Sequence, residues 1–106
     1  MKTVITSSGD SLSSLFDMRF GRAEYFCIYD SKTGESKFLK NENKDNSSGA
    51  GVKVAERMIE LGITQVVSGD FGPKAKNLLD KFNIQMVILQ NAGLSIDDIV
   101  QKMKNK

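Results

Sequence analysis

Apolar residues recur with two periods along this 106-residue chain, and each period predicts one kind of element. Short apolar runs that alternate with polar residues, or that are rich in β-branched residues, are typical of strands. We expect strands at residues 2–7, 23–30, 36–41, 66–68 and 86–89. Apolar residues three and four positions apart are typical of the buried side of a helix. We expect helices at residues 50–61, 73–82 and 96–103.

Residues at the ends of the predicted helices support this assignment. Proline suits the first position of a helix because the N–H that it lacks would have no partner there, so Pro73 is expected to begin the second helix. Asn83 is suited to end that helix in a left-handed conformation. Ser95 is suited to cap the third helix, and residues 104–106 beyond it are expected to fray.

Three further segments have simpler patterns. Leu12, Leu15 and Phe16 have helical spacing, which predicts a short helical turn that caps the core. The continuous apolar run at residues 86–89 is typical of a strand buried on both faces. The segment 41–51 has almost no apolar side chain and is expected to be a mobile loop.

Chain connectivity restricts how the strands can pair. The turn at residues 31–34 is too short for a parallel crossover, so the strands at 23–30 and 36–41 should form an antiparallel hairpin. The β-α-β unit at residues 65–90 should cross over right-handed into parallel strands. We therefore predict one α/β domain over residues 1–106 with a ribonuclease H-like fold, a five-stranded mixed sheet of order 3-2-1-4-5 with helices on both faces. A flavodoxin-like, all-parallel sheet is the alternative, and the short turn disfavours it.

A candidate binding site is expected where the first and fourth strands end. Open α/β sheets bind ligands at the carboxyl ends of parallel strands, so Ser8-Gly9-Asp10 should lie beside Gly69-Asp70-Phe71-Gly72. The glycines allow another group to approach closely, and the following helix N-terminus offers free N–H groups to an anion. The same turn could also be only a tight joint between strand and helix, with Asp70 as the helix cap.

Composition narrows the chemistry. Hydrophobic residues make up 40% of the chain and charged residues 26%, and the net charge of +2 gives no argument for nucleic acid. No run is long enough to span a membrane, no signal-peptide pattern is present, and the single Cys27 fits a reducing cytoplasm. Because the chain has no histidine, a Ser–His or Cys–His nucleophile is excluded and a protein-only zinc site is disfavoured. Cys27 is expected to be a small buried core residue rather than a thiolate ligand.

Three glycine motifs occur in a fixed order along the chain. They are Phe20-Gly21-Arg22-Ala23 followed by Tyr25-Phe26, then Gly49-Ala50-Gly51 at a helix start, then Ser68-Gly69-Asp70-Phe71-Gly72-Pro73-Lys74-Ala75. Their order and spacing resemble the dinitrogenase iron–molybdenum cofactor biosynthesis family from Thr3 to about Val100. The resemblance implies a ribonuclease H-like fold and a carrier of nitrogenase cofactor precursors. Many members of the family have histidine, the expected cluster ligand, where this chain has Arg19 and Ser48.

We therefore predict a non-enzymatic, cytoplasmic binding protein that holds an anionic metal cluster or a related anion at the mouth formed by residues 8–10, 19–22, 48–51 and 69–74. By resemblance, the cargo is an iron–sulfur or iron–molybdenum type cluster, and the partner a cluster-assembly or cluster-accepting protein. Arg19 and Arg22 are candidate donors to the anion, or else surface arginines that pair with Asp17 or Glu24. The predicted site comprises Ser8, Gly9, Asp10, Arg19, Phe20, Gly21, Arg22, Ser48, Gly49, Gly51, Gly69, Asp70 and Gly72.

Two alternative functions remain open from the sequence. The first is a protein-interaction module without a ligand, which would act through the polar 41–51 loop. The second, less favoured, is a Mg²⁺-dependent nuclease in which Asp10, Asp70 and Glu56 would hold the metal ions. Nucleases of the ribonuclease H-like fold place their first carboxylate inside the first strand, where this chain has Val4, Ile5 and Thr6.

Overall fold

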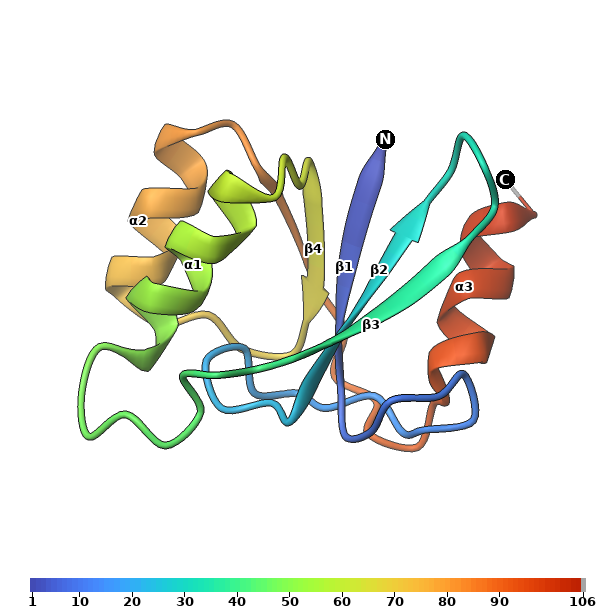
Figure 1. The fold of residues 1–106 in the computed structure, drawn as a ribbon, viewed down its shortest axis with the longest axis horizontal. Helices are drawn as coiled ribbons and strands as arrows, with labels where there is room; N and C mark the ends of the chain where they lie inside the picture. Colours follow the sequence, from blue (N-terminus) through green and yellow to red (C-terminus); the bar gives the residue numbers. More distant parts are fainter. Residues whose placement is uncertain (106) are drawn as a thin grey trace.

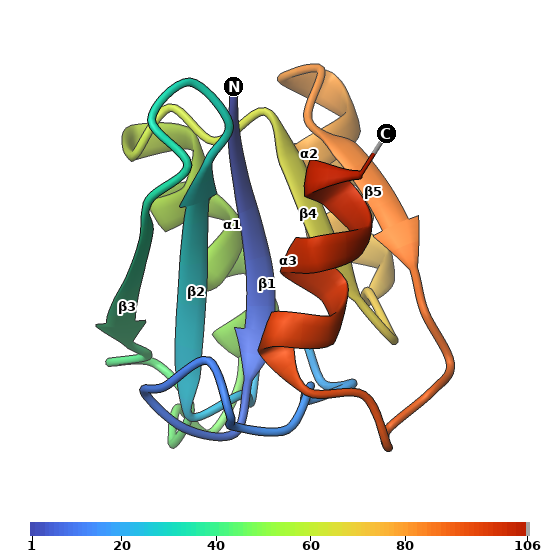
Figure 2. The ribbon, with the colours of Figure 1, turned by 90° about the vertical axis from the view of Figure 1, so that its right-hand side faces the viewer.

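One mixed sheet of five strands lies between helices on both of its faces (Figure 1). Its strand order is β3-β2-β1-β4-β5 (Figure 2). The structure is a computed structural model that describes residues 1–105. The elements are β1 (Lys2–Ser7), β2 (Tyr25–Asp30), β3 (Ser36–Lys40), α1 (Ala50–Glu60), β4 (Gln65–Ser68), α2 (Pro73–Lys81), β5 (Gln85–Ile88) and α3 (Ile96–Lys104). β2 is antiparallel to both β1 and β3, whereas β1, β4 and β5 are parallel. The expected order is confirmed, and the all-parallel alternative is wrong.

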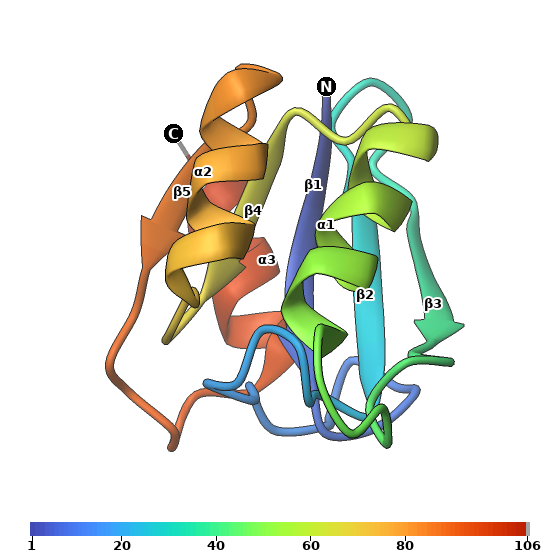
Figure 3. The same cartoon turned by 90° about the vertical axis from the view of Figure 1, so that its left-hand side faces the viewer.

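Side chains alternate between the two faces of the sheet, so each face has its own core. Val4 and Val66 point to the face that α1 and α2 cover (Figure 3). Ile5 and Val67 point to the face that α3 covers (Figure 2). Cys27 lies fully buried in this second core, which confirms its expected role as a core residue. None of the helices that the structure describes is long and apolar enough to cross a membrane.

The segment around Phe16 does not form the expected helical turn. Leu15 and Phe16 instead make isolated β-bridges with Ser95 and Ser7. Leu12 and Leu15 are 40% and 53% exposed, so only Phe16 reaches the core. The helical spacing was misleading because, in so short a segment, backbone partners that are distant in sequence decide the conformation.

The two edges of the sheet differ in how they are protected. β5 is an edge strand with Met86 half-buried and Ile88 61% exposed, so the expectation of a strand buried on both faces is wrong. A continuous apolar run indicates a strand but does not fix its place in the sheet. β3, at the other edge, carries the exposed Lys37 and Lys40, as expected for an edge strand that resists pairing.

The segment 16–19 lies across the carboxyl ends of β1 and β4. The N–H of Asp17 donates to the Thr6 carbonyl at 3.0 Å. The fully buried Thr6 hydroxyl donates to the Asp17 carbonyl and lies 2.9 Å from the Ser68 hydroxyl. β1, β4 and the segment 16–19 are therefore joined at one buried polar point.

A glycine in β4's exit turn makes room for this segment. The N–H of Gly69 donates to the Met18 carbonyl at 3.1 Å. A Cβ atom at Gly69 would lie 2.4 Å from the Cβ atom of Met18, which is closer than real side chains approach. Gly69 therefore has a packing role, because it lets the segment 16–19 continue toward α1 and α2.

The three helices begin in different ways. In α3 the Ser95 hydroxyl accepts from the N–H of Asp98, and the Asp98 carboxylate accepts from the N–H of Ser95, each at 3.0 Å. These hydrogen bonds hold the pKa of Asp98 below its ordinary value. In contrast, α1 and α2 have Gly49 and Gly72 as N-caps, and no side chain caps either helix in the part of the chain that the structure describes. The expected cap at Ser95 and the helix start at Pro73 are both confirmed.

The helix ends also follow the expectations in part. Asn83, just beyond α2, has a φ of 59°, which confirms the left-handed conformation. The third helix continues through Lys104, so the fraying expected from that residue onward does not begin there. Lys106 lies outside the described residues.

We expect Ser95→Ala to lower the free energy of unfolding by about 1 kcal/mol, because the N–H of Asp98 then loses its capping acceptor. Urea unfolding followed by circular dichroism measures the change. Ser13→Ala is the matched control, since Ser13 is exposed and contacts only the Ser11 hydroxyl through its side chain. Equal stability of the two variants would contradict the role given to the capping box.

Candidate functional site

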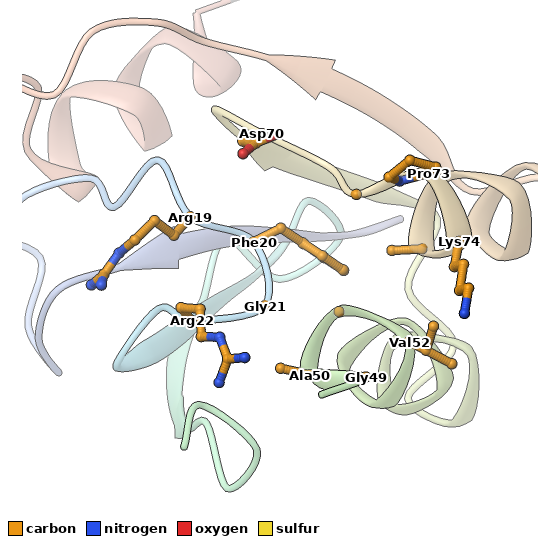
Figure 4. Close-up of a pocket in the computed structure, with 13 residues that line it drawn as sticks. Arg19, Phe20, Gly21, Arg22, Gly49, Ala50, Val52, Asp70, Pro73 and Lys74 are labelled. Atoms are coloured by element: carbon orange, nitrogen blue, oxygen red, sulfur yellow. The ribbon is translucent and has the colours of Figure 1, made fainter. Parts of the chain in front are cut away.

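A cavity of about 520 Å³ lies between the loop that follows the segment 16–19 and the first turns of α1 and α2 (Figure 4). Its volume is in the range of small-molecule binding sites. The lining residues come from three parts of the chain: Arg19, Phe20, Gly21 and Arg22; Gly49, Ala50, Gly51 and Val52; and Asp70, Gly72, Pro73, Lys74 and Ala75.

Two helix N-termini open into this cavity. The first N–H groups of a helix have no intrahelical partner, and here they belong to Ala50–Val52 in α1 and to Lys74 and Ala75 in α2. Neither first turn contains an acidic residue. The helices lie side by side with both N-termini at the cavity (Figure 3), and a Cβ atom on Gly51 would be 3.4 Å from that of Ala75. The positive ends of two helix dipoles therefore meet at one place, which favours a bound anion.

The Arg19 guanidinium forms an ion pair with the carboxylate of Asp17. Its Nε and one terminal nitrogen donate to the two oxygens of Asp17 at 3.1 and 2.9 Å. This hydrogen-bonded pair raises the pKa of Arg19 above its ordinary value. Figure 4 shows the Arg19 side chain extending away from Pro73 and Lys74. The ion pair with Asp17, one of the two alternatives for Arg19, therefore forms, and Arg19 also lines the cavity.

Arg22 holds a loop beside the cavity. One of its terminal nitrogens donates to the Lys44 carbonyl at 2.6 Å and also to the Asn46 carbonyl. Two backbone carbonyls do not neutralise the guanidinium, so its positive charge remains available to a ligand. The polar loop expected to be mobile is therefore attached at its middle to the wall of the candidate site.

Asn41 attaches the same loop at its start, a role that the sequence analysis missed. Its side chain is buried, and the amide nitrogen donates to the carbonyls of Gly21 and Ala23 at 3.1 and 2.9 Å. Its amide oxygen accepts from the N–H of Asn43 at 2.9 Å. Asparagine directly after a strand is a turn signal, but the sequence does not show which carbonyls it will bind.

Phe20 and Gly21 fix the loop against the helices. Phe20 is 2% exposed, and its ring packs on Phe71 with 5.0 Å between centroids. A Cβ atom at Gly21 would lie 2.8 Å from the backbone nitrogen of Gly51, so only glycine allows this approach. The backbone contact brings Arg22 to the start of α1 (Figure 4).

The cavity contains most, but not all, of the predicted site residues. Those that line it are Arg19, Phe20, Gly21, Arg22, Gly49, Gly51, Asp70 and Gly72. Those that do not line it are Ser8, Gly9, Asp10, Ser48 and Gly69. Three further lining residues, Ala50, Pro73 and Lys74, fall within the predicted mouth but not among the predicted site residues. Val52 and Ala75 lie outside the predicted mouth, although they fall in the first turns of predicted helices, where free N–H groups are expected.

The expected proximity of the 8–10 and 69–72 loops is wrong. The carbonyls of Leu12 and Ser14 accept hydrogen bonds from the first N–H groups of α3, so the 8–14 loop lies at the face of the sheet opposite the cavity. The segment 16–19 takes its place beside β4. Asp10 and Asp70 therefore do not form the carboxylate pair that the nuclease alternative requires. Asp70 also does not cap α2, because Gly72 is the N-cap.

The described residues give a metal ion few direct ligands. Among residues 1–105 there is no group of three or more His, Cys, Asp or Glu side chains that could hold a metal ion. Cys27 lies in the core, where burial raises the pKa of its thiol to about 11. Any anion in the cavity would therefore be bound through hydrogen bonds and charge.

These features define an α/β protein with an electropositive cavity at the carboxyl edge of its sheet. The chain belongs to the dinitrogenase iron-molybdenum cofactor family, whose family model matches residues 1–106. None of the curated proteins matches the chain at a significant level.

The solved structures that are similar to nearly all of this chain include two that are at least 25% identical to it. The apo form of the orange protein from Desulfovibrio gigas is 30% identical, with a TM-score of 0.89, and the match covers 98% of this chain and 87% of that one. A putative NifB protein from Thermotoga, described as a member of the DUF35 family, is 25% identical, with a TM-score of 0.82 and the same two coverages, 98% and 87%.

We expect Gly21→Ala to lower the free energy of unfolding by about 1–3 kcal/mol, because the added methyl group would press on the backbone of Gly51. Gly51→Ala is the matched control from the other side of the contact, since its Cβ would meet Ala75 at an ordinary 3.4 Å. Its stability should be unchanged or higher, as is usual for alanine in a helix. Urea unfolding of both variants tests this, and a stable Gly21→Ala protein would refute the close approach.

The Cys27 thiol should react with a disulfide reagent at least about a hundredfold more slowly in the folded protein than in denaturant. Burial removes access, and a pKa of about 11 leaves little thiolate at pH 8. Absorbance of the released thiol measures the rate. Rapid reaction in the native state would show that Cys27 is accessible and would restore it as a candidate ligand.

Proposed function

We propose that this protein is a small, non-enzymatic binding protein that holds an anionic metal cluster, or a related anion, in the cavity between α1 and α2. The observation that carries the proposal is the meeting of two helix N-termini without side-chain caps, together with Arg22 and Lys74, at a single cavity. Family membership and the similarity to the orange protein and to a putative NifB protein support a role with metal clusters.

The charges around the cavity favour a ligand with about two negative charges. Arg19 is balanced by Asp17, and Asp70 offsets one of the two remaining cations, Arg22 and Lys74. The two helix dipoles each add roughly half a positive charge at their N-termini, which leaves roughly two positive charges in all. A ligand that neutralises them also relieves the repulsion between the two positive helix ends.

A cluster would be held by its own anionic surface atoms rather than by bonds from the protein to its metals. Of the two positions where the resemblance implies histidine ligands, Arg19 is bound to Asp17 and Ser48 lies outside the cavity lining. Backbone N–H groups and cationic side chains donate well to sulfide or oxide atoms at the surface of an iron–sulfur or iron–molybdenum type cluster. The residues present therefore fit an anionic cargo, which arrives and leaves without ligand exchange at the protein.

Four further predictions made from the sequence belong to this proposal. They are the single domain, the ribonuclease H-like classification, the cytoplasmic location and a cluster-assembly or cluster-accepting partner. The length of 106 residues supports the single domain, the strand order supports the classification, the single Cys27 supports the location, and family membership supports the partner.

Anaerobic incubation with iron, sulfide and molybdate, followed by desalting, absorbance spectroscopy and metal analysis, tests the proposal. We expect the wild-type protein to retain metal, and Lys74→Gln and Arg22→Ala to bind at least about tenfold more weakly, since a charged hydrogen bond contributes about 1.5–3 kcal/mol. Lys74 is exposed on the first turn of α2, so its substitution leaves the core intact.

Lys32→Gln is the control for this experiment, because it removes one positive charge from the exposed β2–β3 turn. It should bind as the wild type does. Wild-type protein without bound metal would refute the cluster proposal, and equal loss in Lys32→Gln and Lys74→Gln would refute the assignment to this cavity.

A further inference from the structure

No structural feature of the described fold requires a glycine at position 72. Its φ of −63° and ψ of 156° are open to any residue, and a Cβ atom there would meet no heavy atom within 4 Å. Of the other glycines that line the cavity, Gly21 is packed too tightly for a Cβ atom and Gly49 has a φ of 73°, whereas a Cβ atom at Gly51 would touch Ala75 at an ordinary 3.4 Å. At position 72, neither packing nor backbone conformation requires glycine.

Glycine at position 72 also leaves the N-cap of α2 without a side-chain hydrogen-bond acceptor. It is the N-cap of α2, where serine, threonine, aspartate or asparagine would accept a hydrogen bond from Lys74 or Ala75. α3 in the same chain has such a cap at Ser95. α2 therefore lacks a side-chain cap at an N-cap that forms part of the cavity wall, as α1 does at Gly49.

We propose that Gly72 is a specificity-determining residue: its missing side chain lets a ligand larger than a single tetrahedral oxyanion lie against the backbone at the start of α2. This inference rests on the proposed function. A water molecule occupies about 30 Å³ in the liquid, so a five-atom oxyanion fills only a minor part of a cavity of about 520 Å³. A small anion can be held away from Gly72, whereas a cluster that fills the cavity must contact it.

Two variants separate the space at Gly72 from its effect on the helix. Gly72→Ala adds a methyl group and no hydrogen-bond acceptor. Gly72→Ser adds nearly the same bulk and a hydroxyl that can cap α2. If Gly72→Ala lost ligand because α2 was weakened, Gly72→Ser would restore binding. If the space that the new side chain occupies is the cause, Gly72→Ser would not restore binding.

The experiment compares the wild type, both variants and a Gly93→Ala control with two probes. Gly93 is exposed, has no positive φ and lines no part of the cavity. The probes are molybdate alone, measured by equilibrium dialysis, and the cluster assembled from iron, sulfide and molybdate, measured by metal content. We expect both Gly72 variants to hold the cluster at least about tenfold more weakly, Gly72→Ala to keep molybdate within about threefold, and Gly93→Ala to bind both probes as the wild type does.

The outcomes distinguish this inference from the proposed function. Cluster binding by Gly72→Ala at the wild-type level, or its recovery in Gly72→Ser, would overturn the role of Gly72 while the cavity remained the binding site. Equal loss of molybdate and cluster in Gly72→Ala would overturn the selectivity for size. Failure of the wild type to bind either probe would overturn the proposed function, and the inference with it.

Discussion

A hydrogen-bonded junction at the Thr6 hydroxyl holds the candidate site together. Buried between the ends of β1 and β4, it bonds to the Asp17 carbonyl and lies beside the Ser68 hydroxyl. Buried polar groups need such partners, because one left unpaired costs about 1–3 kcal/mol. The junction fixes the segment 16–19 on the sheet, and the loop that follows can then reach α1 and α2. Without it, the cavity would lose the wall that carries Arg22.

The helices on the two faces of the sheet differ in how their N-termini are capped. The α3 face ends in a helix with a complete capping box, and the 8–14 loop satisfies its first N–H groups, so its polar groups are used within the protein. The opposite face has two helices whose N-termini meet with glycine caps and small residues in contact. This face gives up local stability, since glycine and missing caps are unfavourable in helices. The difference between the faces places the candidate site more firmly than any single residue does.

Much of this arrangement could be predicted from the sequence. The short turn at residues 31–34, the β-α-β unit and Pro73 gave the strand order and the start of α2, because each depends on local geometry. The sequence did not show that the 8–14 loop turns to α3, since that choice depends on hydrogen bonds between distant residues. For the same reason, the sequence left open whether Arg19 would face a ligand or pair with Asp17. The sequence motifs therefore identified most of the cavity residues. Hydrogen bonds between residues distant in sequence determined which of the candidates line the cavity.

The exposed side of β5 has a consequence for the behaviour of the protein in concentrated solution. β5 has no charged side chain, and Ile88 is largely exposed to solvent. The opposite edge strand, β3, carries Lys37 and Lys40. An uncharged, apolar edge is a template on which the backbone of another chain can add. We therefore expect any association through strand pairing to occur at this edge of the sheet. A single lysine introduced on β5 would give both edge strands a positive charge and would reduce pairing between molecules at this edge. It would not alter the cavity, because no β5 residue lines it.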